Sequence, residues 1–359
     1  MTKVISFYLP QFYPTPENDE WWGKGFTEWT NVGRAVPLFK GHYQPRVPAD
    51  LGYYDLRIPE VREQQAELAK EAGIYGFCYW HYWFAGDLLL NRVFDEVVQT
   101  KKPDFPFCLC WANHSWKAKT WDSTIPDKML KEQTYPGAED YKNHFLAMLP
   151  AFKDSRYIKT NDGRLLFGIF DPACIPDMEV MVEVWNGLAE ENGLNKFCFF
   201  AFCQGEGNIN NSQGKPFDMI VYDAMFDAVF QNLRTPLKRI MAKIATISNK
   251  PLPLEYSRYS QIALKQFKEF PEAIPCIDPN FDHSPRSGAK GTIIHNSTPT
   301  KWGSFCNKVY SIVQERKDSE FLFIKAWNEW GEGNYMEPDM RFGKGFIEEA
   351  GKVFRHDEG

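Results

Sequence analysis

The chain has 359 residues, of which 43% are hydrophobic and 25% charged, an ordinary composition for a globular protein. Its formal net charge of −6, without any run of Lys and Arg, argues against a nucleic-acid partner. No run of about 18 apolar residues occurs, so we expect no membrane span. The first residues form no recognisable signal peptide and lead directly into an apolar segment, so we expect a cytoplasmic protein without a leader.

Eight cysteines could form disulfides by number alone, but their positions favour free thiols. Most lie inside apolar, strand-like runs, and Cys108 and Cys110 would share one face of a single strand. Their spacing matches no zinc motif, and the chain has no phosphate-binding or dinucleotide-binding glycine pattern. We therefore expect neither a metal nor a cofactor.

Short apolar segments, rich in aromatic and β-branched residues, alternate with segments of helical periodicity along the whole chain. The first such helix begins near Pro59 and ends before Gly73. The predicted strands are residues 3–9, 74–80, 105–112, 164–170, 196–203, 217–224, 273–279 and 320–327. Eight strands alternating with helices predict a single (β/α)8 TIM barrel domain, of class α/β, over residues 1–359. An open, doubly wound sheet is the less favoured alternative.

In a (β/α)8 barrel, functional residues gather at the carboxyl ends of the strands and in the loops that follow. The loops after the first and third predicted strands are much longer than simple connections, and the third includes Trp121 and Asp122. We expect these two loops to wall a binding cavity. The residues expected to bind substrate there are Trp22, Glu28, Trp29, His81, Tyr82, Trp111, Asn113, Trp116, Gln204, Asp282, Arg286, Trp327, Asn328 and Trp330.

Such an aromatic cavity suits an uncharged polar ligand, because indole faces stack on sugar rings while amides and carboxylates bind the hydroxyls. We expect an oligosaccharide or polysaccharide as the partner. Structural alternatives exist: a Trp at a strand end is often only packing, and His81 could be a hydrogen-bonded core histidine. Asp282 and Arg286 could form an ion pair that stabilises their loop.

Two carboxylates, Glu329 and Glu332, lie in "WNEWGEG" directly after the last predicted strand. They meet only if the chain turns, which Gly331 and Gly333 permit because glycine accepts positive φ. Two neighbouring acids cannot both ionise freely, so one becomes an acid and the other a base, as glycosidic cleavage requires. The alternative is a solvated loop with two unrelated acids. Lys325 has the strand parity of Glu329 and could point inward, or outward if the strand is bulged.

The motifs "YLPQFYPTPENDEWWGKGFTEWTNV", "GFCYWHYWF", "WANHSW" and "WNEWGEG" resemble those of the WbsX-like family of bacterial polysaccharide proteins, which is related to glycoside hydrolase family 99. The resemblance covers residues 3 to 350. WbsX-like proteins are commonly described as glycosyltransferases of lipopolysaccharide or capsule biosynthesis. Family 99 implies a retaining endo-α-mannosidase or mannanase on a (β/α)8 barrel.

By this resemblance, Glu329 matches the residue that removes the proton of the substrate's 2-hydroxyl, which then attacks the anomeric carbon and gives a 1,2-anhydro sugar. Glu332 matches the general acid and base. The segment "FDHSPR" departs from the family's "WDNTPR", since Phe281 and His283 replace Trp and Asn. This departure implies a different substrate within the group.

Three functions therefore compete. The favoured one is a retaining glycoside hydrolase that cleaves an α-linked glycan through Glu329 and Glu332. The second is a glycosyltransferase that uses an activated sugar donor, and the third is a sugar-binding barrel without catalysis.

Overall fold

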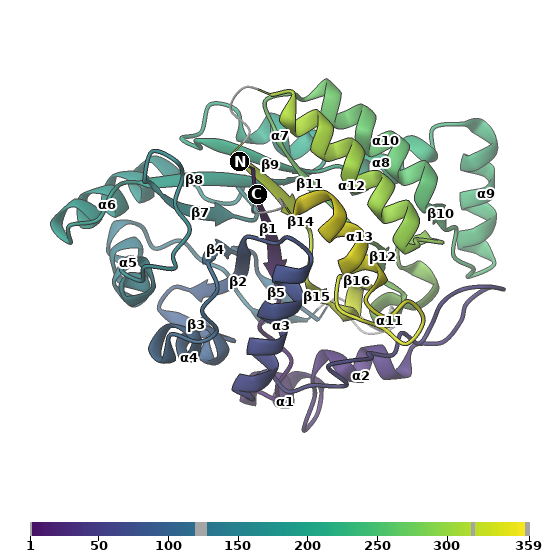
Figure 1. Ribbon diagram of the computed structural model, residues 1–359, viewed down its shortest axis with the longest axis horizontal. Helices are drawn as coiled ribbons and strands as arrows, with labels where there is room; N and C mark the ends of the chain where they lie inside the picture. Colours follow the sequence, from purple (N-terminus) through teal and green to yellow (C-terminus); the bar gives the residue numbers. More distant parts are fainter. Residues whose placement is uncertain (1, 119–127, 317–319, 356–359) are drawn as a thin grey trace.

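The computed structural model describes residues 2–118, 128–316 and 320–355 (Figure 1). Its centre is a closed barrel of parallel strands, in which each strand pairs with the next and β1 pairs with both β14 and β2. The strands are β1 (Lys3–Tyr8), β2 (Gly76–Phe84), β4 (Phe107–Trp111), β7 (Leu165–Ile169), β8 (Phe197–Gln204), β9 (Met219–Asp223), β11 (Ile274–Ile277) and β14 (Phe321–Ile324). The predicted (β/α)8 barrel is confirmed.

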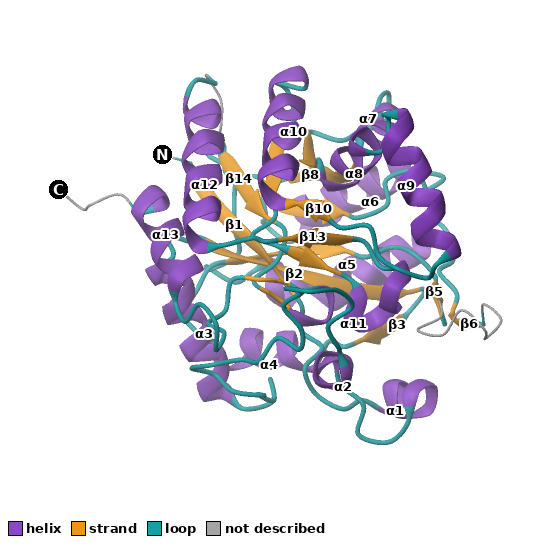
Figure 2. Ribbon diagram, turned by 90° about the vertical axis from the view of Figure 1, so that its right-hand side faces the viewer, coloured by secondary structure: helices purple, strands orange, loops and turns teal. Residues whose placement is uncertain are grey.

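Helices connect these strands and surround them (Figure 2). Near-continuous apolar strands require this cover, because both faces of a parallel barrel are buried. The helices of the connections are α3 (Pro59–Glu71), α4 (Arg92–Thr100), α5 (Ala138–Phe152), α6 (Met178–Glu191), α7 (Glu206–Ser212), α8 (Met225–Asn232), α9 (Pro236–Ile247), α10 (Tyr256–Glu269), α12 (Pro299–Gln314) and α13 (Gly345–Phe354). Among the described residues, no helix combines the length and the apolar character needed to cross a membrane.

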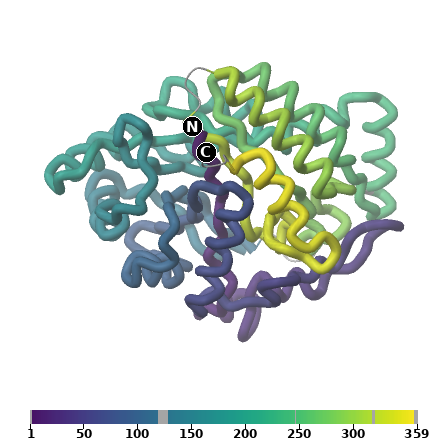
Figure 3. Tube along the Cα trace, in the orientation of Figure 1, coloured from purple at the N-terminus to yellow at the C-terminus, as the bar shows by residue number. Residues whose placement is uncertain are grey.

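Shorter elements build up the carboxyl ends of the strands. The loop after β1 contains α1 (Pro16–Trp22) and α2 (Glu28–Arg34), and the loop after β4 contains the hairpin strands β5 (Trp116–Lys117) and β6 (Met129–Lys131). Figure 3 shows the N-terminal loop, in purple, running toward the yellow C-terminal segment. Backbone hydrogen bonds join the two, from Ala49 N to Pro338 O and from Met340 N to Val47 O, each at 2.9 Å.

The second strand is longer than predicted. It continues through residues 81–84, which were expected to be a loop, and pairs there with the antiparallel β3 (Asp87–Leu89). The pairing partner explains the difference, because an aromatic run can extend a strand only where another strand offers backbone hydrogen bonds. The other predicted strands agree with the structure to within about three residues at each end.

Aromatic side chains fill the barrel interior. Phe7 of β1 lies 5.0 Å from Phe202 of β8, measured between ring centroids, although these strands are not neighbours in the sheet. Phe323 of β14 contacts Phe200 of β8 at 5.2 Å. Contacts between strands on different sides of the barrel must cross its interior, so the residues that share the parity of Phe7 and Phe323 point inward.

Gly168→Ala tests how tightly this interior is packed. A Cβ at Gly168 would lie 2.2 Å from Phe200 Cζ and 2.8 Å from Cys110 Sγ. The ring must shift to admit a methyl group, so we expect the free energy of unfolding to fall by about 1–3 kcal/mol. Chemical denaturation followed by tryptophan fluorescence measures this loss.

Gly187→Ala is the matched control, because Gly187 lies exposed within α6 with no other atom within 4 Å of its Cβ position. Alanine favours a helix, so this variant should gain up to about 1 kcal/mol. Equal effects of the two substitutions would contradict the packing described here.

Candidate active site

A cavity of about 560 Å³ opens at the carboxyl ends of the barrel strands. Its volume lies in the range of roughly 300–1,000 Å³ that is typical of small-molecule sites. Loops or ends of all eight barrel strands contribute to its lining. The sequence-predicted residues that line it are Trp22, Glu28, Tyr82, Trp116, Gln204, Arg286, Glu329 and Glu332.

The two carboxylates meet because the chain turns between them. Residues Trp330–Glu332 form a 3-10 helix, in which side chains three positions apart lie on the same side. The strands β15 (Asn328–Glu329) and β16 (Asn334–Tyr335) pair across this turn and hold its ends together. Gly333 ends the turn with a φ of 56°, a conformation that favours glycine.

Gly331 has a different role from the one predicted. Its φ is not positive, so the turn does not depend on its conformational freedom. A Cβ at Gly331 would instead lie 1.9 Å from Glu28 Oε2. Glycine is required here because the Glu28 carboxylate occupies the space that any side chain would need.

Glu329 is the protonated member of the pair. The side chain is buried, with 6% of the residue exposed, and its Oε1 accepts a hydrogen bond of 2.8 Å from the indole N–H of Trp80. Burial raises the pKa of Glu329 well above its usual range, and the charge of Glu332 raises it further. Each carboxyl group also acts on the pKa of the other, so the two side chains lie close together.

Glu332 is the ionised member. Burial alone would raise its pKa, but the charges of Arg286 and His283 outweigh this effect and hold the pKa below its usual range. Arg286 Nη1 lies 2.6 Å from Glu332 Oε1, and His283 Nε2 lies 3.9 Å from the same oxygen. At neutral pH the pair therefore holds one proton, on Glu329.

Arg286 connects three loops at this point. Besides Glu332, it contacts both oxygens of Glu28, with Nη2 at 3.0 Å from Oε1 and Nε at 3.2 Å from Oε2. Gln11 Nε2 donates a further hydrogen bond of 2.9 Å to Glu28. Two carboxylates, the buried Glu28 and the half-buried Glu332, thus share one guanidinium.

The two long loops form the aromatic walls that the sequence predicts. Trp21 of α1 contacts Trp116 of β5 edge to face, with ring centroids 5.7 Å apart, so the loops after β1 and β4 meet. Tyr82 also packs against Trp116, at 5.1 Å. The candidates Trp121 and Asp122 lie outside the described residues.

Lys325 points into the barrel, which settles the orientation that the sequence left open. Its ammonium lies over the interior ring of Phe202, 4.8 Å from the centroid, and the residue lines the cavity. Trp327, two positions later, is fully buried and packs against Phe77 on the outer side of β2. Strand parity fails between them because β14 ends at Ile324 and the chain no longer alternates.

A model of the family described as "Glycosyltransferase WbsX" matches residues 4–350. The chain belongs to the WbsX glycosyltransferase family. A protein named WxcX from Xanthomonas campestris pv. campestris (strain B100) is 34% identical over 355 residues, which cover 96% of this chain and 48% of WxcX. The same protein of a second strain matches equally. This WbsX-family chain therefore spans about half the length of the curated relatives it matches.

Solved structures share the fold of this WbsX-family chain. A glycoside hydrolase-like protein superposes with a TM-score of 0.63 at 12% identity, covering 99% of this chain and 94% of the other. The GH99 endo-alpha-mannosidase from Bacteroides thetaiotaomicron superposes with a TM-score of 0.59 at 13% identity, covering 98% of this chain and 96% of the other. At these identities the likeness establishes a common barrel fold.

Several residues predicted to bind substrate do not line the cavity of this WbsX-family chain. Most of their polar atoms are bonded within the protein instead: Asn328 bonds the backbone N and O of Leu9, and Asn113 bonds the backbone of Asp171. The indole N–H groups of Trp29, Trp111 and Trp330 donate to Tyr54, Trp83 and Glu337, whereas that of the buried Trp327 has no hydrogen-bond partner among the described residues. The residues outside the cavity are Trp29, His81, Trp111, Asn113, Asp282, Trp327, Asn328 and Trp330.

His81 is the core histidine that was the alternative interpretation. Its Nε2 lies 2.7 Å from Nε2 of His144, a helix residue that is fully buried. Burial lowers the pKa of His81 to about 3, so it stays neutral in the folded protein. Its position in an extended β2, under α5, removes it from the cavity.

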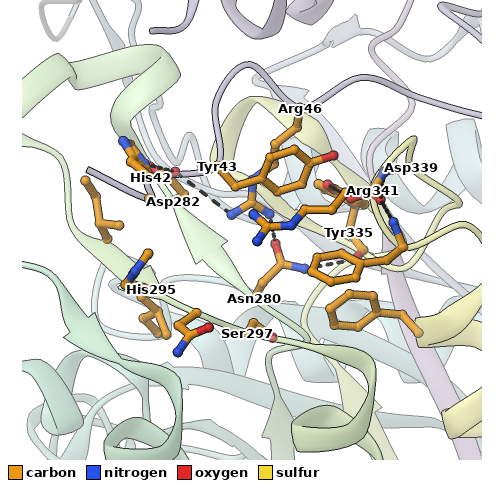
Figure 4. Close-up of a pocket in the computed structure, with 16 residues that line it drawn as sticks. His42, Tyr43, Arg46, Asn280, Asp282, His295, Ser297, Tyr335, Asp339 and Arg341 are labelled. Carbon is orange, nitrogen blue, oxygen red and sulfur yellow. Dashed lines mark hydrogen bonds and ion pairs between the residues drawn. The ribbon is translucent and has the colours of Figure 1, made fainter. Parts of the chain in front are cut away.

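Asp282 lies in a second cavity, of about 280 Å³, beside the first (Figure 4). Its Oδ2 accepts hydrogen bonds of 2.7 Å from His42 and Gln44, and Arg46 lies at 3.9 Å. The alternative of an ion pair with Arg286 is wrong, because Arg286 contacts Glu28 and Glu332 instead. Asp282 holds the loops around it together.

The sequence analysis missed other cavity residues: Gln11, Asn18, Phe26, Trp80, Phe170 and Phe226. Trp80 carried a usable signal, because it lies near the carboxyl end of a predicted strand with inward parity. The loop residues carried none that separates them from their neighbours, since only the folded loops place them. Among the described residues, no cluster of three or more His, Cys, Asp or Glu side chains could hold a metal ion.

Gly331→Ala tests the contact between the turn and Glu28. The methyl group must displace the Glu28 carboxylate from Arg286, so we expect the free energy of unfolding to fall by about 1–3 kcal/mol. In a Glu28→Ala background the space is free, so the same substitution should lower the free energy of unfolding much less. Chemical denaturation of the four proteins of this cycle measures the coupling. Additive effects would show that the two residues do not compete for one space.

Proposed function

We propose that this chain is a carbohydrate-active enzyme that cleaves an α-linked glycan with retention, through Glu329 and Glu332. The observation that carries the proposal is the carboxyl pair itself, which shares one proton on the floor of an aromatic cavity. An acid and a base within reach of the same bond are what glycosidic cleavage needs. Stacking rings and hydrogen-bonding side chains around the pair suit a sugar.

The resemblance to glycoside hydrolase family 99 favours a substrate-assisted route. In the route implied by the family 99 resemblance, Glu329 takes the proton of the 2-hydroxyl while that oxygen attacks the anomeric carbon. Glu332 gives its proton to the leaving oxygen. Water, deprotonated by Glu332, then opens the 1,2-anhydro sugar, and Glu329 returns its proton to the 2-oxygen.

The directions of the two pKa shifts, up for Glu329 and down for Glu332, correspond to the middle of this route. After the first step, Glu329 holds a proton and Glu332 is ionised, which is the state that Arg286 stabilises in the structure. For the first step, the proton must lie on Glu332. We infer that it moves from Glu329 to Glu332 when a sugar hydroxyl donates to Glu329.

Transfer of the glycosyl unit to another sugar is the second candidate function, and the description of the family favours it. The same anhydro sugar would then be opened by an acceptor hydroxyl instead of water. A donor activated by a nucleotide is a further possibility within this candidate. The cytoplasmic location stays a prediction.

Glu329→Gln and Glu332→Gln test the roles of the pair. With α-mannosides and bacterial surface polysaccharides as substrates, each variant should lose about 10²–10⁴-fold in kcat. An aryl α-glycoside with a good leaving group should restore much of the activity of Glu332→Gln but not of Glu329→Gln, because such a group leaves without a proton. Release of reducing sugar is measured with and without a glycosyl acceptor and a nucleotide-sugar.

Glu20→Gln is the matched control, since Glu20 lies exposed on α1 and does not line the cavity. It should be as active as the native protein. Turnover only in the presence of a nucleotide-sugar would establish the transferase instead. Full activity of both Glu variants would leave no catalytic role for the pair.

The pH dependence of kcat/KM should be bell-shaped. Activity needs one proton on the pair, so it should fall at low pH as Glu332 becomes protonated and at high pH as Glu329 loses its proton. Because the pKa of Glu329 is raised, the alkaline limb should lie well above the usual titration range of a carboxyl group. Initial rates across the pH range measure this, and an alkaline limb at the usual range of Glu would contradict it.

A further inference from the structure

Lys325 is a buried cation without a bonded partner. The residue is 4% exposed and lines the cavity next to the carboxyl pair. Across the described parts of the chain, its ammonium makes no hydrogen bond and has no carboxylate oxygen within 4 Å. Its neighbours are aromatic rings, with the nitrogen 4.8 Å from the centroid of Phe202 and 5.6 Å from that of Trp80.

Four carboxyl groups keep this ammonium charged from a distance. Burial would lower the pKa of Lys325, but its interactions with these carboxyl groups outweigh this effect and raise the pKa. Glu329 and Glu332 lie on the cavity side, and Asp223 and Asp278 come from the ends of the neighbouring strands. Asp223 accepts a hydrogen bond from Met225 N through Oδ1, while its Oδ2 has no partner among the described residues, and Asp278 accepts from Tyr259 and Asn334.

The charge of Lys325 is therefore balanced, while its N–H donors are not used within the protein. A buried donor without an acceptor is costly, so a donor that faces a cavity is a place for a ligand oxygen. Because the surrounding charges already compensate the cation, the matching group is a neutral oxygen, such as a sugar hydroxyl, rather than a carboxylate or phosphate.

We propose that Lys325 donates a hydrogen bond to the sugar hydroxyl that Glu329 deprotonates, and that its charge stabilises the negative charge that forms on that oxygen. This inference rests on the function proposed above. In the step, the hydroxyl proton passes to Glu329 and the oxygen forms its bond to the anomeric carbon. Lys325 keeps its own protons throughout, so its contribution grows as the transition state is approached.

Lys325→Met removes the charge and keeps the length of the side chain. On an α-linked glycan that the native protein cleaves, kcat should fall by about 10²–10³-fold while KM changes little, because the contact strengthens in the transition state. The alkaline limb of the pH profile should also move to higher pH, since the charge of Lys325 lowers the pKa of Glu329. A residue that only balances buried charge would not produce this split between kcat and KM.

Other charged or titratable groups that act on this limb stay in place in the variant. Those that face Lys325 or the carboxyl pair are Glu332, Asp223, Asp278, Cys276, Arg286, His283 and Tyr82.

The melting temperature of Lys325→Met shows whether this variant folds. If it does not fold, Lys325→Arg tests the role of Lys325 instead. Arginine keeps the charge, so the alkaline limb should stay, but a planar guanidinium places its donors differently and kcat should fall by about 10-fold or more. Lys142→Arg, at an exposed position of α5, is the matched control and should retain native rates.

The inference is overturned if a folded Lys325→Met variant keeps a kcat within about 3-fold of the native value. Where the methionine variant does not fold, the same result for Lys325→Arg overturns it. If the native protein turns over no glycan, the proposed function fails on its own. Calorimetric binding of the same glycans to the native protein and to Lys325→Arg then tests Lys325, and affinities that are equal, or absent in both, overturn its role.

Discussion

The ion pairs of Arg286 are the interaction on which the site depends. One guanidinium from the loop after β11 contacts Glu28 of α2 and Glu332 of the last turn. Without it, two carboxylates would face each other beside Glu329, and at least one would take up a proton. Arg286 thus keeps Glu332 ionised and leaves a single proton for the pair. Its contacts also join three loops that are far apart in the sequence, so the proton state and the shape of the cavity depend on the same side chain.

The aromatic interior strengthens these electrostatic effects. Phe7, Phe202 and Trp80 fill the barrel beneath the cavity and exclude water from the floor on which Lys325 and Glu329 lie. In such surroundings charges interact more strongly than in water, and each unpaired donor or acceptor costs more. A few side chains can therefore determine how many protons the site holds. Of these rings, Trp80 also lines the cavity.

Much of the fold and part of the site could be predicted from local patterns. Strand order and barrel closure follow from eight apolar runs, and the turn between Glu329 and Glu332 follows from short-range geometry around Gly333. Residues at strand ends were harder to place. His81 was taken for a loop residue because nothing nearby shows that β2 pairs with β3 and continues. Lys325 and Trp327 have the same parity in the sequence, yet they point to opposite sides. Strand β14 ends at Ile324, before both residues, so their side chains no longer alternate as in a strand.

The sequence by itself determined the barrel, the long aromatic loops and the presence of two acids at one strand end, because periodicity and spacing are local properties of the chain. Tertiary structure alone decided which tryptophans and amides reach the cavity, since Asn113, Asn328, Trp29 and Trp111 bond to segments elsewhere along the chain. It also decided where the proton of the pair lies. That proton responds to burial and to the charges of Arg286 and Lys325, which depend on distances that no local pattern contains.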